Sequence, residues 1–526
     1  MVSDSYDYII VGAGSAGCVL ADRLTRSGRH SVLLLEAGGS DARFWVKVPV
    51  GYAVNYANPA LNWGYHTEAD EGLSGRASYW PRGRVVGGCS SINAMAYMRG
   101  MRHDFDDWAA AGATGWDWDA VHETYRIMEE PGGGPVRVGD LSDQMHPFSG
   151  RFLDAARQAG HPPSDDLNAA DGIGYYRSTV WRGRRWSAAD AFLRPALRRR
   201  NLRMVTHAHV TQLEFNGRRA TGLTYDHKGA TRTVHARQEV ILSAGAINSP
   251  QILQLSGIGP ADLLRRHGIA PRMDLPKVGQ GLQDHLAITH QFTTDRRTLN
   301  HGLGRRRGRI AAGIRYVLTR KGPLAVPVNQ VGGFVRSAPQ VERPDIQLFC
   351  NPASYEITTD GAVVMDRAGG FILSGQPCRP TSRGAVRIRS ADHRDAPMID
   401  ANSLGTEYDR QAAIRASRLV RQLSASPALA SVTTAPKDDR FPAMNDDDLL
   451  QDFRDRAATV YHPTCTCRMG TDAANSVTDP RLRVHGVAGL RVVDASAFPN
   501  ITSGNTNAPV MMLAMRAADM ILQDAR

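Results

Sequence analysis

The first forty residues carry the pattern that most limits how this chain can fold. Residues 6–11 are largely β-branched or aromatic, as in a buried strand, and residues 12–17 match the G-x-G-x-x-G turn that opens a helix. A second predicted strand covers residues 31–35 and ends at Glu36. Strand, glycine-rich turn, helix and strand in this order predict a dinucleotide-binding βαβ unit, with a plain βαβ unit as the alternative.

The residues of the turn have separate tasks in binding a dinucleotide. Gly12 permits the tight bend, Gly14 lets a pyrophosphate approach the backbone, and Gly17 lets the helix pack close to the strand. Free N–H groups and the positive end of the helix dipole attract an anion at the helix start. We therefore predict that Ser15 and Ala16, which lie there, also contact the cofactor.

The acidic residue after the second strand limits which cofactor fits. Glu36 stands about twenty residues beyond the turn, where a carboxylate is expected to bind ribose hydroxyls and to disfavour a 2′-phosphate. We predict that Glu36 and the adjacent Ala37 contact the cofactor. The stretch does not distinguish FAD from NAD, so both remain open at this point.

The chain is long for a single core and is basic. Its 526 residues predict two or three domains, and 42% hydrophobic with 22% charged residues is ordinary for a globular protein. The formal charge is +11, but the two basic clusters, at 198–200 and 305–307, lack the interleaved aromatics of nucleic-acid binding. We expect no nucleic-acid partner and interpret the clusters as solvated surface, with peripheral contact to an anionic membrane as the weaker alternative.

The cysteines and the apolar runs indicate the cellular compartment of the protein. The six cysteines contain no C-x-x-C motif or disulfide framework, which favours reduced thiols. Cys465 and Cys467 lack histidine or cysteine partners at metal-ligand spacing, so no metal is predicted. No signal peptide precedes the first strand, and no apolar run approaches the roughly twenty residues of a membrane span. We predict a cytoplasmic protein.

Two further stretches are rich in small residues. Residues 82–95 contain Gly, Ser and Ala, which let the backbone approach a flat or charged group, or else they form a helix start capped by Ser91. Residues 245–259 follow a predicted strand at 240–242. Their helix is predicted to have its N-cap at Ser249, with proline at the first helical position and a glycine after the last.

These two stretches resemble the two signatures of the glucose–methanol–choline (GMC) oxidoreductases, flavoproteins that oxidise alcohols. The first is matched by residues 83–93 and 97–100, and the second by residues 245–259. The resemblance covers the whole chain and implies FAD as the cofactor. Some relatives attach the flavin through a histidine inside the first signature, where this chain has Ile92, so we predict non-covalent FAD.

The resemblance implies an α/β fold in which separated stretches assemble a Rossmann-like FAD-binding domain. Residues 1–150, 200–290 and 456–526 are assigned to that domain, and residues 151–199 and 291–455 to a substrate-binding domain of antiparallel sheet plus helices. The glycine-rich loop at 131–135, inside the first stretch, is interpreted as a connection.

The resemblance also implies FAD contacts outside the glycine turn. Val210, for example, is expected to end a strand that passes the adenine ring. The implied contacts beyond the first βαβ unit are Trp63, Val86, Gly88, Asn93, Ala94, Met95, Ala96, Val210, Asp494, Ala495, Asn505 and Thr506.

The C-terminal stretch predicts a helix that points at the flavin. Apolar residues from 510 to 521 recur at a helical period, and the preceding residues 505–509 end in proline, which is typical of a first turn. The N-terminus of such a helix favours the negative charge of a reduced flavin ring. The alternative is an ordinary docking helix.

A histidine and an amide are the candidate catalytic residues. Alcohol oxidation needs a group that takes the hydroxyl proton, and a neutral imidazole suits that task. In residues 460–470, which resemble the His-Pro motif of the family, His462 is the predicted base. Asn505 stands where the family has His or Asn, so we predict that it hydrogen-bonds the substrate oxygen. His285, in another family motif, is interpreted as structural.

The substrate and the electron acceptor are less constrained. In choline-oxidising relatives a carboxylate precedes the stretch aligned with 332–334, whereas this chain has Gln330, and a neutral amide does not neutralise a buried cation. This difference argues against choline. We expect a small-molecule alcohol as substrate, and oxygen, a quinone or an electron-transfer protein as acceptor. Val460 permits reaction with oxygen but does not decide between an oxidase and a dehydrogenase.

Other readings of the same chain stay open. A monomer or a homodimer is expected. The alternatives to alcohol oxidation are a non-redox lyase or a photodecarboxylase on the same architecture, or a flavin-binding protein without catalysis.

Overall fold

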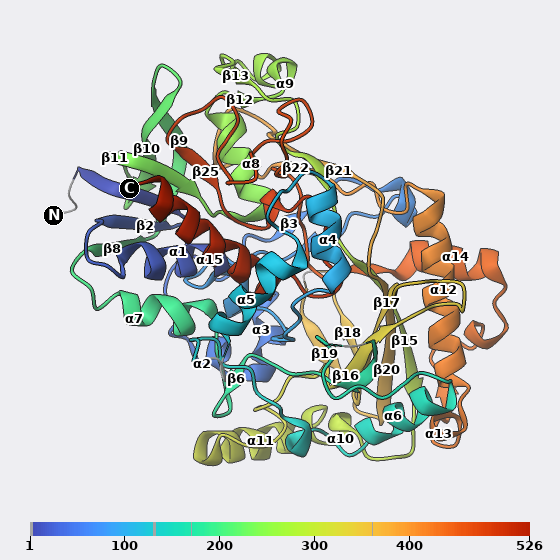
Figure 1. The fold of residues 1–526 in the computed structure, drawn as a ribbon. Coiled ribbons are helices and arrows are strands. Elements are labelled where there is room, and N and C mark those ends of the chain that lie inside the picture. The colour runs from blue at the N-terminus through green and yellow to red at the C-terminus, as the bar shows by residue number, and fades with distance from the viewer. Residues whose placement is uncertain (1–3, 130–132, 170, 360, 526) are drawn as a thin grey trace.

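The structure is a computed structural model that describes residues 4–129, 133–169, 171–359 and 361–525. Two sheets with helices outside them form the body of the molecule, and the N- and C-termini lie on the same side (Figure 1). The predicted α/β fold is confirmed. Part of the glycine-rich loop at 131–135 lies outside the described residues.

The first sheet contains both predicted strands of the βαβ unit. Five of its strands run parallel to one another, and β11 also begins an antiparallel meander with β10 and β9. In order across the sheet, the strands are β8 (Leu202–Thr206), β2 (Val32–Glu36), β1 (Ser5–Val11), β11 (Ala230–Leu242), β10 (Arg219–His227) and β9 (Ala208–Asn216), and β25 (Leu490–Val492) pairs in parallel with the end of β11.

Alternation along β1 explains why both faces of this sheet are covered. Tyr8 and Ile10 pack with α1 (Ser15–Thr25) and α15 (Asn507–Asp524). Ile9 and Val11 point to the other face, with side chains of α8 (Gly245–Leu255) and of the meander. Side chains of a strand alternate between faces, so an uninterrupted apolar run predicts burial on both sides, as found.

The second sheet is antiparallel and includes strands from distant parts of the chain. In order, they are β23 (Ala435–Pro436), β15 (Leu286–Thr293), β20 (Gly370–Pro377), β17 (Ile346–Asn351), β16 (Val331–Val335) and β5 (Gly172–Tyr175), and β24 (Ala458–Thr459) pairs with β15. The helices beside it are α6 (Ser149–Gln158), α12 (Glu407–Ser424), α13 (Pro427–Ala430) and α14 (Asp446–Arg456).

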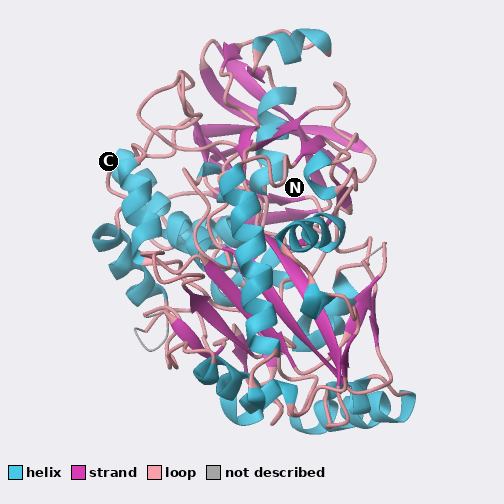
Figure 2. Cartoon of the chain, turned by 90° about the vertical axis from the view of Figure 1, so that its right-hand side faces the viewer, coloured by secondary structure: helices cyan, strands magenta, loops and turns pink. Residues whose placement is uncertain are grey.

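The two faces of the second sheet have different neighbours. Leu348 and Cys350 of β17 pack in one apolar cluster with side chains of α6, α12 and α13. Viewed from the side of α12 and α14, the helices lie in front of the strands (Figure 2). Phe349 and Asn351, the alternate residues of the same strand, line a cavity instead. One face of the sheet therefore packs on helices, and the other face lines a cavity that can hold a ligand.

Short elements complete the chain. The remaining helices are α2 (Phe44–Lys47), α3 (Tyr52–Asn55), α4 (Arg102–Ala110), α5 (Trp118–Met128), α7 (Arg194–Ala196), α9 (Ala261–Arg266), α10 (Leu299–Leu303) and α11 (Arg306–Thr319). The remaining strands are β3 (Tyr65–His66), β4 (Tyr79–Trp80), β6 (Val180–Trp181), β7 (Arg184–Arg185), β12 (Ile258–Gly259), β13 (Met273–Asp274), β14 (Gln280–Leu282), β18 (Tyr355–Ile357), β19 (Val363–Met365), β21 (Gly384–Arg387) and β22 (Met398–Asp400). Of the helices described, none is both long enough and apolar enough to cross a membrane.

The predicted start of α8 is wrong. The helix begins at Gly245, so Pro250 lies inside it instead of at its first position. A proline within a helix leaves the carbonyl four residues earlier without its N–H partner. Here that carbonyl belongs to Ala246 and accepts a hydrogen bond from Thr466 Oγ1 at 2.7 Å. A distant hydroxyl therefore lets the helix extend one turn further than local signals predict.

The first signature also differs from one expectation. Residues 88–91 form a 3₁₀ turn, and the chain continues without an α-helix until α4. The alternative of a helix start capped by Ser91 is therefore wrong. Ser91 Oγ instead donates to the carbonyl of Val86 at 2.7 Å, which closes the turn on itself.

Candidate active site

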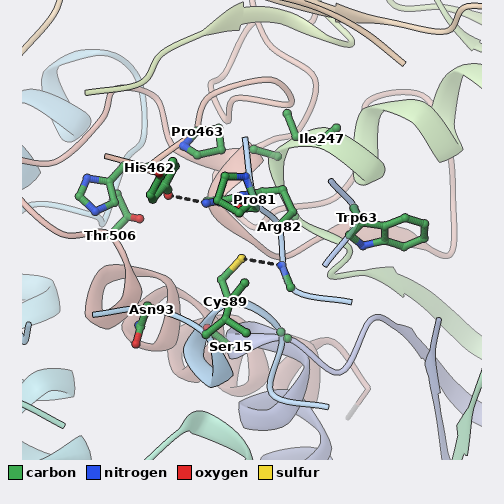
Figure 3. Close-up of a pocket in the computed structure, with 18 of the residues that line it drawn as sticks. Ser15, Trp63, Pro81, Arg82, Cys89, Asn93, Ile247, His462, Pro463 and Thr506 are labelled. Carbon is green, nitrogen blue, oxygen red and sulfur yellow. Dashed lines mark hydrogen bonds between the residues drawn. The ribbon is translucent and has the colours of Figure 1, made fainter. Parts of the chain in front are cut away.

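A cavity of about 380 Å³ is lined by residues of both sheets. Strand β1 and the glycine turn border one part of it, and the inner faces of β15, β17 and β20 border another. Figure 3 looks into this space, with Ser15, Asn93, His462 and Thr506 around it. These residues come from separate parts of the sequence, so folding assembles the site from segments far apart in the chain.

The three glycines of the turn differ in the space available beside each of them. Gly12 has φ +98°, and a Cβ there would lie 2.5 Å from the carbonyl oxygen of Ser243. A Cβ on Gly17 would lie 1.9 Å from the carbonyl oxygen of Gly12, so close packing of α1 requires this glycine. A Cβ on Gly14 would have no neighbour closer than 3.9 Å, and Gly14 lines the cavity. The fold itself leaves the space beside Gly14 free for a ligand.

Three helix N-termini meet at the cavity. The first residues of α1, α8 and α15 all line it, and Ser15 Oγ donates to Asn507 Oδ1 at 2.7 Å between two of these helices. Helix N-termini present unpaired N–H groups and a positive partial charge. The cavity is therefore suited to a group with negative charge, such as a pyrophosphate.

Most of the predicted site residues line this cavity. Gly17 and Val86 do not: Gly17 packs under the turn, and the backbone N–H of Val86 donates to the carbonyl of Gly39 at 3.0 Å. The predicted residues that line it are Gly12, Gly14, Ser15, Ala16, Glu36, Ala37, Trp63, Gly88, Asn93, Ala94, Met95, Ala96, Val210, His462, Asp494, Ala495, Asn505 and Thr506.

The two carboxylates in this lining are engaged by donors of the protein. Glu36 accepts hydrogen bonds from the backbone N–H groups of Ala13 and Gly38, both at 2.8 Å, while burial raises its pKa to about 7. Asp494 accepts from Gly245 N at 2.9 Å and from Ser249 Oγ at 2.6 Å. Asp494 thus ties the start of α8 to the end of β25, and burial raises its pKa.

Two histidines and an asparagine form a hydrogen-bonded chain at the cavity. His462 is 8% exposed, and its Nδ1 lies 3.0 Å from Nδ1 of His285. His285 Nε2 lies 2.7 Å from the carbonyl oxygen of Cys378. On the other side, Asn505 Nδ2 lies 3.1 Å from Nε2 of His462. Among the described residues, none donates a hydrogen bond to the buried Oδ1 of Asn505.

The carbonyl of Cys378 determines the proton positions along this chain. A carbonyl only accepts, so the proton of a neutral His285 is on Nε2, and its Nδ1 is left as an acceptor. His462 must then donate from Nδ1. Its Nε2 consequently carries a lone pair and accepts from the amide of Asn505. An unprotonated ring nitrogen therefore faces the cavity.

Burial keeps both imidazoles neutral. It lowers the pKa of His285 to about 4. Burial, the neighbouring His285 and then Arg82 hold the pKa of His462 well below its usual 6.5. A neutral imidazole with an available Nε2 is the form that can take a proton at neutral pH.

The backbone around His462 is held firmly. Tyr461, directly before it, has φ +70°, a conformation that bulky residues rarely adopt. Arg82 Nη2 donates to the carbonyl of Tyr461 at 2.6 Å. Asp284 Oδ1 accepts from the backbone N–H of His462 at 2.7 Å, and burial raises the pKa of Asp284 to about 6. Neighbouring segments thus stabilise the strained conformation that presents the imidazole.

Two expectations about this region are wrong. Gln330 is fully buried outside the cavity lining, where its Oε1 accepts from His146 N at 2.8 Å and from Ser149 Oγ at 2.9 Å. It therefore gives no information about a cation in the cavity. Val210 lies near the start of β9 and not at a strand end, although it does line the cavity.

Family models match most of the chain. The two models described as GMC oxidoreductase match residues 6–287 and 380–514. The chain belongs to the GMC oxidoreductase family. Among curated relatives of this oxidoreductase, human mitochondrial choline dehydrogenase is 41% identical, with 98% of this chain and 90% of the human protein covered. Alcohol dehydrogenase [acceptor] of Pseudomonas putida is 40% identical, with 98% and 96% covered.

Solved structures resemble this oxidoreductase over nearly its whole length. Pyridoxine 4-oxidase from Mesorbium loti has a TM-score of 0.88 and 30% identity, with 98% of each chain covered. A variant of the formate oxidase of Aspergillus oryzae has a TM-score of 0.92 and 26% identity, with 99% of each chain covered. With the curated relatives, these findings make the protein an FAD-dependent alcohol oxidoreductase, acting on a small molecule and passing electrons to an acceptor.

Sequence reasoning missed part of the site of this GMC oxidoreductase. His285 was interpreted as structural, yet its ring contacts that of His462 directly. No local signal pairs the two, because they are 177 residues apart. Three tyrosines of the lining were also missed, because no motif marks them: Tyr52, Tyr56 and Tyr355.

Proposed function

We propose that this GMC oxidoreductase removes the hydroxyl proton of an alcohol with Nε2 of His462 while Asn505 holds the alcohol oxygen. A hydroxyl placed between these side chains would donate to Nε2 and accept from Asn505 Nδ2, replacing their direct contact of 3.1 Å. An alkoxide releases hydride more readily than an alcohol does. FAD, when bound, supplies the hydride acceptor, N5 of its ring. The hydrogen-bonded chain from Cys378 to Asn505 carries this proposal.

We assign the cofactor to the part of the cavity beside the glycine turn. The space beside Gly14 and the helix N-termini suit the pyrophosphate, and Glu36 suits a ribose. The N-terminus of α15 suits negative charge on the flavin ring. In this proposal the FAD-binding domain is made from residues 1–150, 200–290 and 456–526, and residues 151–199 and 291–455 complete the substrate side.

We propose an uncharged alcohol as the substrate. Choline dehydrogenases are among the relatives, so choline is the natural competitor. Among the described residues that line the cavity, the acidic side chains are Glu36 and Asp494, and both accept several hydrogen bonds on the cofactor side. Asn329 and Asn351 border the inner face of the second sheet. An amide there binds a neutral hydroxyl but does not neutralise a buried cation.

Anaerobic mixing with a panel of alcohols and choline tests this function. We expect primary alcohols to bleach the flavin absorbance and choline to bleach it far more slowly. Cleavage of a cyanohydrin without bleaching would support a lyase, and light-dependent loss of CO₂ from a carboxylic acid would support a photodecarboxylase. A flavin inert to the whole panel would favour a binding protein.

Repeating the panel with oxygen or with a quinone identifies the acceptor. Peroxide formation indicates an oxidase, and Val460 at the cavity permits oxygen to approach.

Acid precipitation tests non-covalent attachment: we expect the yellow colour in the supernatant, because Ile92, which lines the cavity, cannot bond covalently to the flavin. A coloured pellet would contradict this.

A further inference from the structure

Helix α11 exposes a stripe of large apolar side chains. Ile310 is 55% exposed, Ile314 57%, Val317 57% and Leu318 77%. Spaced at i, i+4, i+7 and i+8, these four residues lie on one side of a helix. Ala312 and Tyr316, about half a turn away around the helix, are buried in the protein. The helix thus packs by one side and presents a second apolar side outward.

Basic residues surround this stripe. Residues 305–321 contain no Asp or Glu. Their seven basic side chains are all exposed, and within the part of the chain that is described no carboxylate forms an ion pair with them. They are Arg305, Arg306, Arg307, Arg309, Arg315, Arg320 and Lys321.

The charge of this helix opposes its own stability. Its first turn contains no acidic residue, its N-cap is Arg305 without a side-chain hydrogen bond, and Arg306 and Arg307 follow. Positive charge at a helix N-terminus is unfavourable, because the macrodipole is positive there. Helix stability therefore does not explain these arginines. Residues that disfavour their own helix are typical of a functional surface.

Neighbouring segments extend the same surface. Phe44, 50% exposed, has its ring 6.3 Å from that of Tyr316, and Trp45 beside it is 41% exposed. Tyr316 Oη also donates to the carbonyl of Gly183 at 2.9 Å, which brings the β6–β7 hairpin with its exposed arginines 182 and 184 against α11. Helix α11 lies at one edge of the molecule (Figure 1), so a flat partner can reach it.

We propose that α11, together with Phe44 and Trp45, docks this oxidoreductase on an anionic lipid surface. A helix whose apolar side chains are bordered by arginines lies in the plane of a membrane interface, with the apolar side among the acyl chains and the guanidinium groups at the phosphates. The excess of positive charge selects anionic lipid over neutral lipid. This contact is peripheral and leaves the fold unchanged.

Co-sedimentation of the FAD-loaded protein with lipid vesicles tests the proposal. We expect binding to phosphatidylcholine vesicles that contain phosphatidylglycerol and little binding to phosphatidylcholine alone. Raising the salt from about 0.1 M to about 1 M should release most of the bound protein, because charge is screened. Equal binding to both vesicles, or none to either, would overturn the proposal.

Three variants separate the contributions. R306E/R307E/R309E should lower the affinity for anionic vesicles by at least about 100-fold, roughly fivefold for each of the three arginines lost. I314Q/L318Q should weaken binding at every salt concentration. The control R198E/R200E/R266E changes the net charge equally at exposed residues elsewhere and should bind like the wild type.

Folding and self-association are checked on the same samples. Acidic residues favour a helix N-terminus, so R306E/R307E/R309E should melt no lower than the wild type and should reduce its flavin at the same rate in solution. Equal loss of binding in the control variant would mean a nonspecific charge effect and would overturn the proposal. So would a wild-type dimer that I314Q/L318Q converts to monomers while vesicles bind neither protein, because a second copy would then cover the surface.

Discussion

The two parts of the cavity that we propose as the cofactor side and the substrate side are built by different means. The cofactor side includes a glycine turn and the first residues of three helices, where the backbone offers N–H groups. The substrate side consists of side chains that alternate along the strands of an antiparallel sheet, such as Phe349 and Asn351. A ligand that approaches the backbone closely requires glycines, which form a recognisable sequence motif. A ligand held by side chains requires no such motif. Motifs consequently report the cofactor better than the substrate.

The largest expected effect separates two glycines on the cofactor side. Gly17→Ala should prevent folding, because its Cβ would lie 1.9 Å from the carbonyl oxygen of Gly12. Gly14→Ala should fold, because its Cβ has room, but should weaken FAD binding by about tenfold or more, since a methyl group fills the space for the pyrophosphate. Soluble yield, circular dichroism and FAD titration measure the difference. A folded Gly17→Ala protein, or unchanged FAD affinity in Gly14→Ala, would contradict this assignment.

The next effect concerns catalysis alone. His462→Ala should slow flavin reduction by about 10² to 10⁴, the usual contribution of a general base. FAD binding should persist, because the glycine turn and helix N-termini are intact. Anaerobic stopped-flow with a good substrate gives the rate, and His122→Ala, at an exposed position on α5, is the control. Near-normal reduction in His462→Ala would remove the imidazole from the mechanism.

His285 should act through His462. His285→Phe removes the acceptor of the Nδ1 proton and should lower the rate by about tenfold to a hundredfold, as when a partner that orients a metal-bound imidazole is removed. His285→Gln can still donate to Cys378 and accept from His462, so it should recover much of the rate.

The pH profile provides a second measurement on these variants. His285 helps to hold the pKa of His462 low, so the acidic limb of the pH–rate profile should move to higher pH in both variants. Equal rates for Phe and Gln with an unmoved acidic limb would mean that His285 only fills space.

The smallest effect is on stability. Burial raises the pKa of Asp284 from 3.8 to about 6, so the folded protein retains a proton that the unfolded chain loses above about pH 4. The free energy of unfolding should therefore fall between about pH 4 and pH 6, by on the order of 3 kcal/mol for this group. Asp284→Asn should lack this part of the decline in urea titrations. Parallel pH dependence in the two proteins would show that Asp284 titrates normally.

The sequence predicts the first βαβ unit well because its signals are local. The strands at β1 and β2 follow from apolar runs, and the turn between them from three glycines. Where a distant residue intervenes, local reasoning fails. The early start of α8 depends on Thr466, which satisfies a carbonyl 220 residues away.

The contacts around the second sheet are predicted less well for the same reason. The alignment with choline-oxidising relatives implies a substrate contact for Gln330, but its Oε1 accepts hydrogen bonds from His146 N and Ser149 Oγ. His285 carries no local sign of its contact with His462. The face of a strand on which a residue lies, and the partner it meets there, depend on register within the sheet, which a single sequence does not give.

A neutron crystal structure of the FAD-bound protein at neutral pH tests the central claim most directly, because it locates the hydrogens on the imidazoles. We predict deuterium on Nε2 of His285 and on Nδ1 of His462, with Nε2 of His462 bare and facing the cavity. Deuterium on Nε2 of His462, with Nδ1 bare, would contradict the account, because the lone pair would then face His285 and the nitrogen facing the cavity could not accept the alcohol proton.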